Sequence, residues 1–342
     1  MTVLVTGGAG YVGMCVVAEL AAAGRDARVL DVLLHGQEQL AGRLEEGGAE
    51  VIRADIRDTE ARRRALEGCD AVVHLAAIVG DPACALDPAL SAEVNVGGSR
   101  ALADDAAAAG VRHLVFASTC SNYGRMADPT VPIAEDGELA PVSLYAEQKV
   151  AIEKELLAGG RDGLSPTCLR FATVYGVAPR MRFDLTVNEF TRDLWAARPL
   201  EVFGERFWRP YVHAADAARA VAMVLEAGPE RLGGEVFNVG HSDENYRKLD
   251  LVEIITSELG RGDVSFVHRD EDPRDYKVSF EKVRRELGFE PRHRVPDGVH
   301  ELVEALERGD FPDPFAADYS NLESARRGSA GDGGINVGRT SS

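Results

Sequence analysis

Short apolar runs alternate with alanine-rich helical stretches along the first half of the chain. The apolar runs occur at residues 2–8, 26–32, 49–55, 70–77 and 112–119. Each is a near-continuous run of β-branched or apolar residues, as expected of strands covered on both faces of a sheet. The helical stretches 12–23 and 99–109 are followed by Gly24 and Gly110, typical of helix C-termini. The alternation predicts βαβ units and an α/β domain with a doubly wound parallel sheet.

The alternation becomes irregular after about residue 176. Shorter polar segments that carry arginines and aromatic residues follow at 180–190 and 203–213, and strand-like sequence returns at 235–240. This change of pattern indicates a second, smaller lobe that is interleaved with the end of the first domain.

We therefore expect three regions. A sheet domain spans residues 1–176, and segments around 209–240 return to it. A smaller C-terminal substrate-binding lobe spans residues 177–322. Residues 323–342 are rich in glycine, serine and arginine, have little to bury, and are predicted to form a disordered tail.

Composition and charge exclude several classes of protein. The chain has 342 residues, 45% of them hydrophobic, and no apolar run near the ~20 residues that a membrane span needs. Its formal net charge of −18 would repel a nucleic acid. The first strand follows Met1 directly, without room for an export signal, and the five cysteines form no CxxC pair. We expect a cytoplasmic protein with no membrane partner, no nucleic-acid partner and no bound metal.

A glycine-rich turn follows the first strand and opens a helix. Gly7, Gly10 and Gly13 have the spacing GxxGxxG, which permits a tight turn, close approach of the backbone to a pyrophosphate, and close packing of helix on strand. The helix N-terminus adds free N–H groups and the positive end of the helix dipole. The turn predicts a dinucleotide site in a Rossmann-type domain.

Two aspartates follow the next strands of this domain. Asp31 ends the second strand, where a carboxylate accepts from both ribose hydroxyls of the adenosine half. A 2′-phosphate would be repelled there and no arginine stands beside Asp31 in the sequence, so NAD is favoured over NADP. Asp55 follows the third strand. It either accepts from the adenine amino group or caps the next helix, and the sequence leaves both interpretations open.

Tyr145 and Lys149 are one helical turn apart in the segment YAEQK. A phenol with a pKa of about 10 is a poor base, but a neighbouring ammonium and an oxidised nicotinamide would bring its pKa toward neutrality. The alternative is an ordinary surface pair. The strand before this helix runs into the hydroxyl-bearing segment STCS at 118–121, at the sheet edge where such folds bind ligands, and this favours the catalytic interpretation.

These motifs together give the chain a resemblance to the extended short-chain dehydrogenase/reductases, in particular to the NAD-dependent nucleotide-sugar epimerases and dehydratases. The resemblance covers roughly residues 1–310. It rests on TGGAGYVG, HLAA, NVGGS, STCSNYG, YAEQK, RFATVYG, RPYVH and FNVG, which occur in the family's order.

The resemblance implies roles for individual residues. Tyr145 would be the acid/base, Lys149 its partner and a ligand of the nicotinamide ribose, and Thr119 the hydroxyl donor to the sugar. The residues expected around NAD are Gly7, Gly10, Tyr11, Val12, Gly13, Asp31, Asp55, Ile56, Leu75, Ala76, Ala77, Asn95, Tyr145, Lys149 and Phe171. Those expected at a nucleotide-diphosphate sugar are Thr119, Thr173, Asn188, Arg209, Arg269, Asp272 and Arg274, with Arg209 on the diphosphate.

The chain also departs from the family at two places. The family's sugar 4,6-dehydratases carry an Asp-Glu pair after the threonine, where this chain has Cys120 and Ser121, so the acid and base for elimination are missing. Cys120 is interpreted as a small buried residue, and His213 as a packed one. The loop 78–88 is unusual for the family and leaves the sugar open.

We expect a nucleotide-sugar epimerase, acting at C4, that oxidises its substrate transiently and returns the hydride. The same tyrosine, lysine and threonine would serve a 4-keto-sugar reductase or a sugar-acid decarboxylase, which stay as alternatives. An NAD-binding regulatory protein is disfavoured because both Tyr145 and Lys149 are present. The resemblance further implies a homodimer that pairs through two helices of each subunit, one of them bearing Tyr145.

Overall fold

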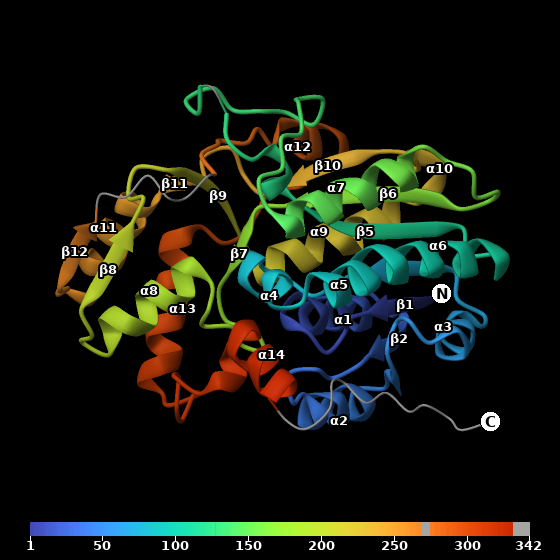
Figure 1. Cartoon of the computed structure of the whole chain (residues 1–342), viewed down its shortest axis with the longest axis horizontal. Coiled ribbons are helices and arrows are strands. Elements are labelled where there is room, and N and C mark those ends of the chain that lie inside the picture. The colour runs from blue at the N-terminus through green and yellow to red at the C-terminus, as the bar shows by residue number, and fades with distance from the viewer. Residues whose placement is uncertain (127, 268–273, 331–342) are drawn as a thin grey trace.

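The computed structural model describes residues 1–126, 128–267 and 274–330, and its centre is a parallel sheet (Figure 1). The sheet has seven strands in the order β10-β6-β5-β4-β1-β2-β3. The strands are β1 (Thr2–Thr6), β2 (Asp26–Asp31), β3 (Glu50–Arg53), β4 (Ala71–His74), β5 (His113–Thr119), β6 (Ser165–Phe171) and β10 (Val236–Val239). The predicted doubly wound, Rossmann-type sheet is confirmed.

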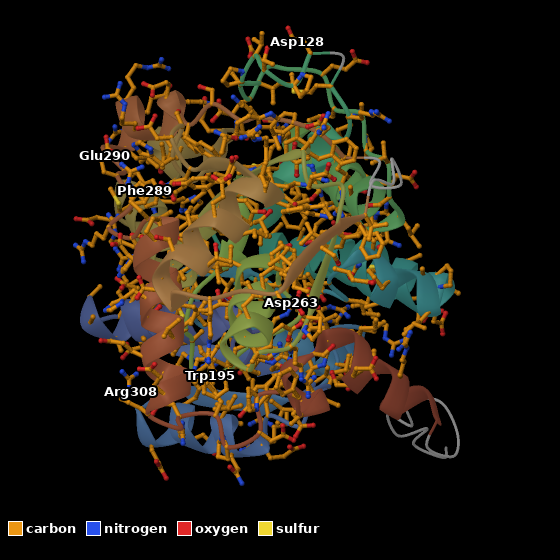
Figure 2. All side chains as sticks on the ribbon, turned by 90° about the vertical axis from the view of Figure 1, so that its left-hand side faces the viewer. Asp128, Trp195, Asp263, Phe289, Glu290 and Arg308 are labelled. Carbon is orange, nitrogen blue, oxygen red and sulfur yellow. The ribbon has the colours of Figure 1, made fainter. Side chains whose placement is uncertain are left out.

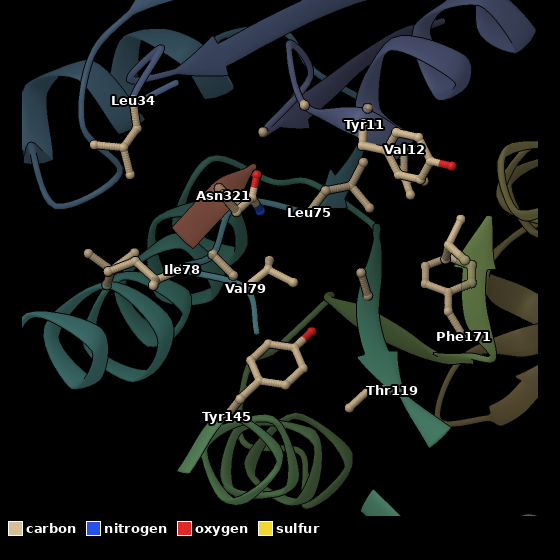
Figure 3. Close-up of a pocket in the computed structure, with 18 of the residues that line it drawn as sticks. Tyr11, Val12, Leu34, Leu75, Ile78, Val79, Thr119, Tyr145, Phe171 and Asn321 are labelled. Carbon is tan, nitrogen blue, oxygen red and sulfur yellow. The ribbon is translucent and has the colours of Figure 1, made fainter. Parts of the chain in front are cut away.

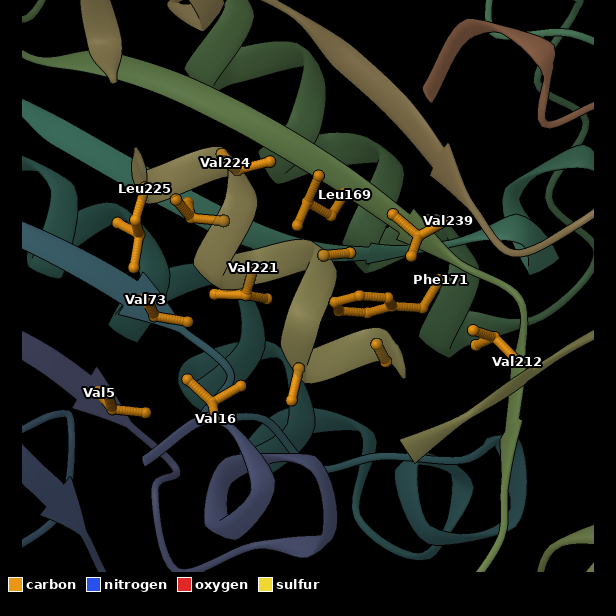
Figure 4. Packing of buried hydrophobic residues seen from close by; sticks show 14 of the residues in the cluster. Val5, Val16, Val73, Leu169, Phe171, Val212, Val221, Val224, Leu225 and Val239 are labelled. Carbon is orange, nitrogen blue, oxygen red and sulfur yellow. The ribbon is translucent and has the colours of Figure 1, made fainter. Parts of the chain in front are cut away.

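Successive residues of the central strands point to opposite faces of the sheet. Val3 and Val5 join one apolar cluster and Leu4 joins another. The helices that surround the sheet domain are α1 (Tyr11–Ala22), α2 (Glu38–Glu46), α3 (Thr59–Leu66), α6 (Ser99–Ala108), α7 (Leu144–Leu157), α9 (Ala214–Ala227), α10 (Pro229–Leu232) and α12 (Glu281–Leu287). Helices α1 and α9 cover the face of Val5, where Val16 and Val221 meet the sheet (Figure 4). Both faces are therefore covered, which explains why the strands are apolar at successive positions.

A second lobe follows β6 and contains two small sheets. Its elements are β7 (Thr173–Tyr175), α8 (Thr186–Trp195), β8 (Leu200–Phe203), β9 (Trp208–His213), β11 (Asn245–Arg247), α11 (Lys248–Leu259), β12 (Val264–Val267) and α13 (Val295–Glu307). β11-β9-β7 form one sheet and β12-β8 the other, over a core of their own. Trp195 and Asp263 lie on this lobe, while Asp128 lies at the far end of the molecule (Figure 2).

The chain returns to the main sheet after the first part of this lobe. Helix α9 packs on α1, and β10 pairs in parallel with β6 at the edge of the sheet. Several short helices lie in the connections between these larger elements. These are α4 (Asp81–Leu86), α5 (Pro88–Ala92), the π-helix η1 (Glu93–Gly98), and the 3₁₀ helices η2 (Cys120–Tyr123) and η3 (Ala317–Tyr319).

The predicted disordered tail is wrong for its first part. Residues 321–330 form helix α14 (Asn321–Ala330), which packs against α4, and the buried residues Asn321 and Ser324 lie on it. The polar composition of this segment concealed its order, because it is held by hydrogen bonds more than by apolar burial. The rest of the predicted tail, 331–342, lies outside the described residues.

A buried ion pair joins the end of α7 to the sheet. Glu153 Oε1 and Arg170 Nη2 are 2.5 Å apart, and neither side chain is more than 5% exposed. Ser118 donates to the same carboxylate at 2.6 Å, and Arg170 donates to the Tyr123 hydroxyl at 2.7 Å. Because Glu153 lies two turns after Tyr145 on the same helix face, this network fixes the face that carries Tyr145 and Lys149.

Within the described ranges, no helix combines the length and the apolar character required to cross a bilayer.

Candidate active site

The glycine turn between β1 and α1 leaves no room for side chains. Gly7 has a φ of 72°, and a Cβ added to it would lie 2.8 Å from the backbone N of Ala76. A Cβ on Gly13 would lie 2.1 Å from the carbonyl O of Gly7. Helix α1 begins at Tyr11 without a capping side chain, so none of its first N–H groups is used by a cap. Turn and helix form a backbone cradle that fits a pyrophosphate.

Asp31, at the end of β2, is fixed by the backbone of the neighbouring turns. Its two carboxylate oxygens accept from the N–H groups of Ala9 at 3.0 Å and Leu33 at 2.9 Å. Burial raises the pKa of this carboxyl, while the two N–H donors lower it. The carboxylate therefore has a defined orientation where the adenosine ribose of a dinucleotide is expected.

Asp55 does not cap the following helix. The cap of α3 is Asp58, which accepts from the N–H groups of Glu60 and Ala61. Asp55 accepts instead from the backbone and the guanidinium of Arg57, at 2.8 Å in both cases. The helix-cap alternative is thus wrong, and Asp55 stays a candidate for the adenine.

One cavity of about 360 Å³ joins the glycine turn to helix α7 (Figure 3). Most of the predicted site residues share it. Those that line it are Gly7, Gly10, Tyr11, Val12, Gly13, Asp31, Asp55, Ile56, Leu75, Ala76, Ala77, Thr119, Tyr145, Lys149, Phe171, Thr173 and Arg274. Sequence motifs that are far apart in the chain, from the glycine turn to the segment around Phe171, therefore line a single cavity.

Tyr145 and Thr119 project into this cavity from α7 and from the end of β5 (Figure 3). Ser143 caps α7, and Tyr145 lies in the first turn. Lys149 Nζ donates to the carbonyl O of Ala117 at 2.7 Å and lies 5.9 Å from the centre of the Tyr145 ring. The Thr119 hydroxyl oxygen accepts from the Ser121 N–H at 3.1 Å, so its own proton can be donated to a ligand.

Burial dominates the acid–base properties of this pair. It raises the pKa of Tyr145 above its ordinary value; the field of Cys84 adds to this, and that of Arg182 opposes it. Burial also lowers the pKa of Lys149 to about 8. The predicted lowering of the Tyr145 pKa requires an oxidised nicotinamide as well as Lys149, so it stays a prediction, while burial of the phenol acts in the opposite direction.

Two predicted site asparagines lie behind the cavity wall. Asn95 exchanges hydrogen bonds with the backbone of Ile78, at 2.8 and 3.0 Å, and so holds a residue that does line the cavity. Asn188 donates to the hydroxyl of Tyr11 at 3.2 Å and accepts from the N–H of Gly176 at 2.9 Å. Neither side chain lines this cavity. Their amides are buried and support Ile78 and Tyr11 from behind.

Of the charged residues predicted at the substrate, some line the cavity and others do not. Arg274 lines the cavity, where it forms an ion pair with Asp81 at 3.1 Å. Arg209 does not line it; its guanidinium lies 5.2 Å from the centre of the Tyr276 ring, which forms part of the wall. The other two candidates, Arg269 and Asp272, lie outside the described residues.

Cys120 and His213 are both packed away from the cavity. Burial raises the pKa of the Cys120 thiol, which donates to the carbonyl O of Arg170. His213 Nε2 is 2.8 Å from a carboxylate oxygen of Glu301, and its Nδ1 accepts from the N–H of Ala215. Ser121, the next residue after Cys120, does line the cavity. The interpretation of Cys120 and His213 as packed residues agrees with this geometry.

Sequence reasoning missed several residues of the wall. Arg180, Arg182 and Asn321 line the cavity together with His35 and Tyr276. Two arginines so close together in a chain of net charge −18 were a usable signal of an anionic ligand. Asn321 gave no signal, because it lies near the end of the predicted substrate-binding lobe, outside every motif that the sequence offered.

Comparisons with known proteins agree with this geometry. Residues 3–240 match the model of the NAD dependent epimerase/dehydratase family. A UDP-glucose 4-epimerase of Lactobacillus helveticus is 30% identical over 322 residues, 87% of this chain and 94% of that protein. A dTDP-glucose 4,6-dehydratase of Streptomyces niveus is 30% identical over 317 residues, 89% and 92% of the two chains. The crystal structure of MoeE5 in complex with UDP-glucuronic acid and NAD has a TM-score of 0.79 at 28% identity, covering 90% of this chain and all of that one.

A glycine cradle, an aspartate held by backbone N–H groups and a Tyr-Lys pair on one cavity are the features of a dinucleotide-dependent enzyme of the short-chain dehydrogenase/reductase class. The chain belongs to the NAD-dependent epimerase/dehydratase family, and its cofactor is NAD.

Proposed function

We propose that the chain is a nucleotide-sugar 4-epimerase that works by transient oxidation. The observation that carries this proposal is that Tyr145 and Thr119 project into the same cavity that the glycine turn opens. A sugar hydroxyl held there would meet a proton acceptor and a hydrogen-bond donor next to the dinucleotide site. The UDP-glucose 4-epimerase similarity supports the same reaction.

In this mechanism Thr119 donates a hydrogen bond to the C4 oxygen and Tyr145 takes the proton of the C4 hydroxyl. Bound NAD supplies a hydride acceptor at C4 and a positively charged ring. That charge and the ammonium of Lys149 would together bring down the pKa of Tyr145, which burial alone holds high. Once the keto-sugar has turned over and its other face has been reduced, Tyr145 would return the proton to the C4 oxygen. No net redox change results.

The wall of the cavity argues against 4,6-dehydration. Elimination of water from C5 and C6 needs a carboxyl acid and a base close to the sugar. The carboxylates that line the cavity within the described part of the chain are Asp31 and Asp55, at the adenosine end. Next to Thr119 stand the buried Cys120 and the hydroxyl of Ser121, neither of which replaces an acid–base pair.

Cations of the wall support a nucleotide diphosphate as the anionic part of the substrate. Arg182 and Arg274 line the cavity on a chain that is otherwise strongly acidic. Fixed guanidinium groups in a partly desolvated site bind phosphates through charge-assisted hydrogen bonds. Arg209 does not line this cavity, and its guanidinium lies 5.2 Å from the centre of the Tyr276 ring, which does line it.

A uronic acid is a second candidate for the sugar. The observation in its favour is Arg182, the cavity arginine whose field reaches the phenol of Tyr145. A cation near the reacting carbon could hold a C6 carboxylate, and the similar protein MoeE5 binds UDP-glucuronic acid. With such a substrate the same Tyr145 could serve epimerisation or, if the C4 ketone promotes it, loss of carbon dioxide.

The test is a product assay by NMR over UDP-, dTDP-, GDP- and CDP-sugars, including uronic acids, with NAD present. Interconversion of two C4 epimers with no accumulation of NADH supports the proposal. Steady NADH release, or carbon dioxide as a product, would replace it by a dehydrogenase or a decarboxylase.

We also propose that two copies pair through α6 and α7. Ala151 lies exposed on the outer face of α7, and Arg100 on α6 forms an ion pair with Glu155 on α7. Small side chains allow close approach of helices from a second copy. Sedimentation velocity should show a dimer, and Ala151→Arg should shift it to monomer; a wild-type protein that sediments as a monomer would refute the pairing.

A further inference from the structure

Helix α14 lies beyond the residues that the family model matches, yet it contributes to the cavity. The match ends at residue 240 and α14 begins at Asn321. Figure 1 shows this helix between α4 and α2. It packs on α4, and Ser324 Oγ meets Nδ1 of His35, just before α2, at 2.6 Å. Since Asn321 and His35 both line the cavity, α14 forms part of its wall.

The base of this helix is firmly attached to the second lobe. Phe183 packs edge-on against Phe311 and Tyr319, with ring centres 5.1 and 5.5 Å away. The Asn321 N–H donates to the carboxylate of Asp184 at 2.8 Å, and the same carboxylate holds Arg182 at 2.9 Å. The position of α14 is therefore coupled to an arginine of the cavity.

Two buried polar atoms of the wall are left without a protein partner. Within the described part of the chain, Oδ1 of Asn321 and Nη2 of Arg180 have no hydrogen-bond partner, and these residues are 8% and 5% exposed. Arg180 lines the same cavity as Asp31, the aspartate expected at the adenosine ribose, and the charge of Asp31 acts on its guanidinium. An unpaired buried polar atom costs about 1–3 kcal/mol, so two of them on one cavity indicate a ligand that pairs with both.

We propose that α14 is a cap that completes the NAD site, with Asn321 and Arg180 as ligands of the adenosine half or the pyrophosphate. The Asn321 amide oxygen accepts from a hydroxyl and Arg180 donates to an anionic or hydroxyl oxygen. The cap slows the departure of NAD, so that the cofactor stays bound through many turnovers. The inference depends on the NAD site and not on which sugar is the substrate.

The test measures dissociation of the cofactor and needs no turnover. Full-length protein is loaded with NADH, chased with excess NAD, and followed by the fluorescence of bound NADH. A chain that stops after Ser320 should release NADH at least 10-fold faster than the full chain. A chain that stops after Ala330 keeps α14 and should release it at the unchanged rate, which makes it the matched control.

Point variants separate the ligand role from a structural one. Asn321→Leu keeps the size of the side chain and should speed release about 3- to 10-fold, the loss of one hydrogen bond of about 1 kcal/mol. Arg180→Met should speed NADH release by the same factor or by a larger one. Glu323→Ala, on the exposed face of the same helix, should change nothing.

An unchanged release rate in the chain that stops after Ser320 would overturn the proposal, even if its melting temperature fell. If that chain does not fold, Asn321→Leu decides: equal release by this variant, at wild-type circular dichroism, also overturns it.

Discussion

At the glycine turn the wall of the cavity is backbone, whereas around the sugar position it is made of side chains from distant segments. Gly7 and Gly13 shape the cofactor end of the cavity within one short segment. A Cβ atom at either position would lie less than 3 Å from backbone atoms. The second end combines Thr119 from β5, Tyr145 from α7 and Arg182 from the second lobe. The comparison teaches that the cofactor end is specified by local geometry, and the substrate end by tertiary packing.

The largest effect is expected at the side-chain end. Tyr145→Phe removes the proton acceptor and should lower kcat by at least 100-fold, the usual range for a general acid–base, while NAD affinity stays within about 3-fold because the cradle is backbone. Steady-state assays and NAD titration measure the two quantities. Tyr246→Phe, whose hydroxyl bonds Glu244 away from the cavity, serves as the control. Retained turnover in the Tyr145 variant would move catalysis to another residue.

The buried ion pair behind α7 gives the next effect. Glu153→Gln leaves Arg170 with an uncompensated charge and should cost about 3–5 kcal/mol in the free energy of unfolding. Urea denaturation measures it. Glu155→Gln removes more exposed ion pairs with Arg100 and Arg161 and should cost at most about 1 kcal/mol. Similar losses in the two variants would show that the Glu153 network does not anchor the catalytic helix.

A smaller effect is expected at the backbone end. Gly13→Ala places a Cβ 2.1 Å from Gly7 O, so the turn must shift; we expect a loss of about 1–3 kcal/mol in stability and at least 10-fold in NAD affinity. Calorimetry gives both values. Gly42→Ala, on α2 with no atom within 4 Å of the added Cβ, should instead gain about 0.5–1 kcal/mol. Unchanged NAD binding in Gly13→Ala would contradict the cradle.

The smallest effect is expected from the buried ammonium of Lys149, which lowers the stability of the folded chain. The folded pKa of Lys149, about 8, lies below its ordinary 10.5, so the unfolded chain holds this proton more tightly and stability rises between these pH values. Lys149→Met removes that cost but leaves Ala117 O unpaired, for a net gain of about 1–2 kcal/mol at pH 7. Thermal melts at pH 7 and pH 10 measure it.

In these melts the gain of Lys149→Met should shrink or reverse at pH 10. Lys154→Met, on the exposed side of the same helix, should leave the melting temperature unchanged at both pH values. If Lys149→Met is less stable than the wild type at pH 7, the ammonium of Lys149 stabilises the folded chain.

The same contrast explains what the sequence could predict. Periodic apolar runs and the glycine spacing predicted the sheet, the turn and the place of Asp31, because each depends on neighbours within a few residues. Asn188 and Arg209 were expected at the substrate, but neither lines the cavity: Asn188 on α8 donates to the Tyr11 hydroxyl, and the Arg209 guanidinium lies against the Tyr276 ring. Asn321 was missed because hydrogen bonds to remote partners, His35 and Asp184, order its segment. Hydrogen bonds to residues so far away in the chain leave no periodic pattern in the sequence.

The late return of the chain to the main sheet affects how the protein can be made. Strand β10 pairs with β6 only after some sixty further residues have been added, about the length of the intervening lobe segment. While the ribosome synthesises that segment, the edge of β6 stays open and α1 lacks its neighbour α9. A ribosome that pauses before Val236 therefore holds an incomplete domain, and this stage is the point at which chaperones would be expected to act.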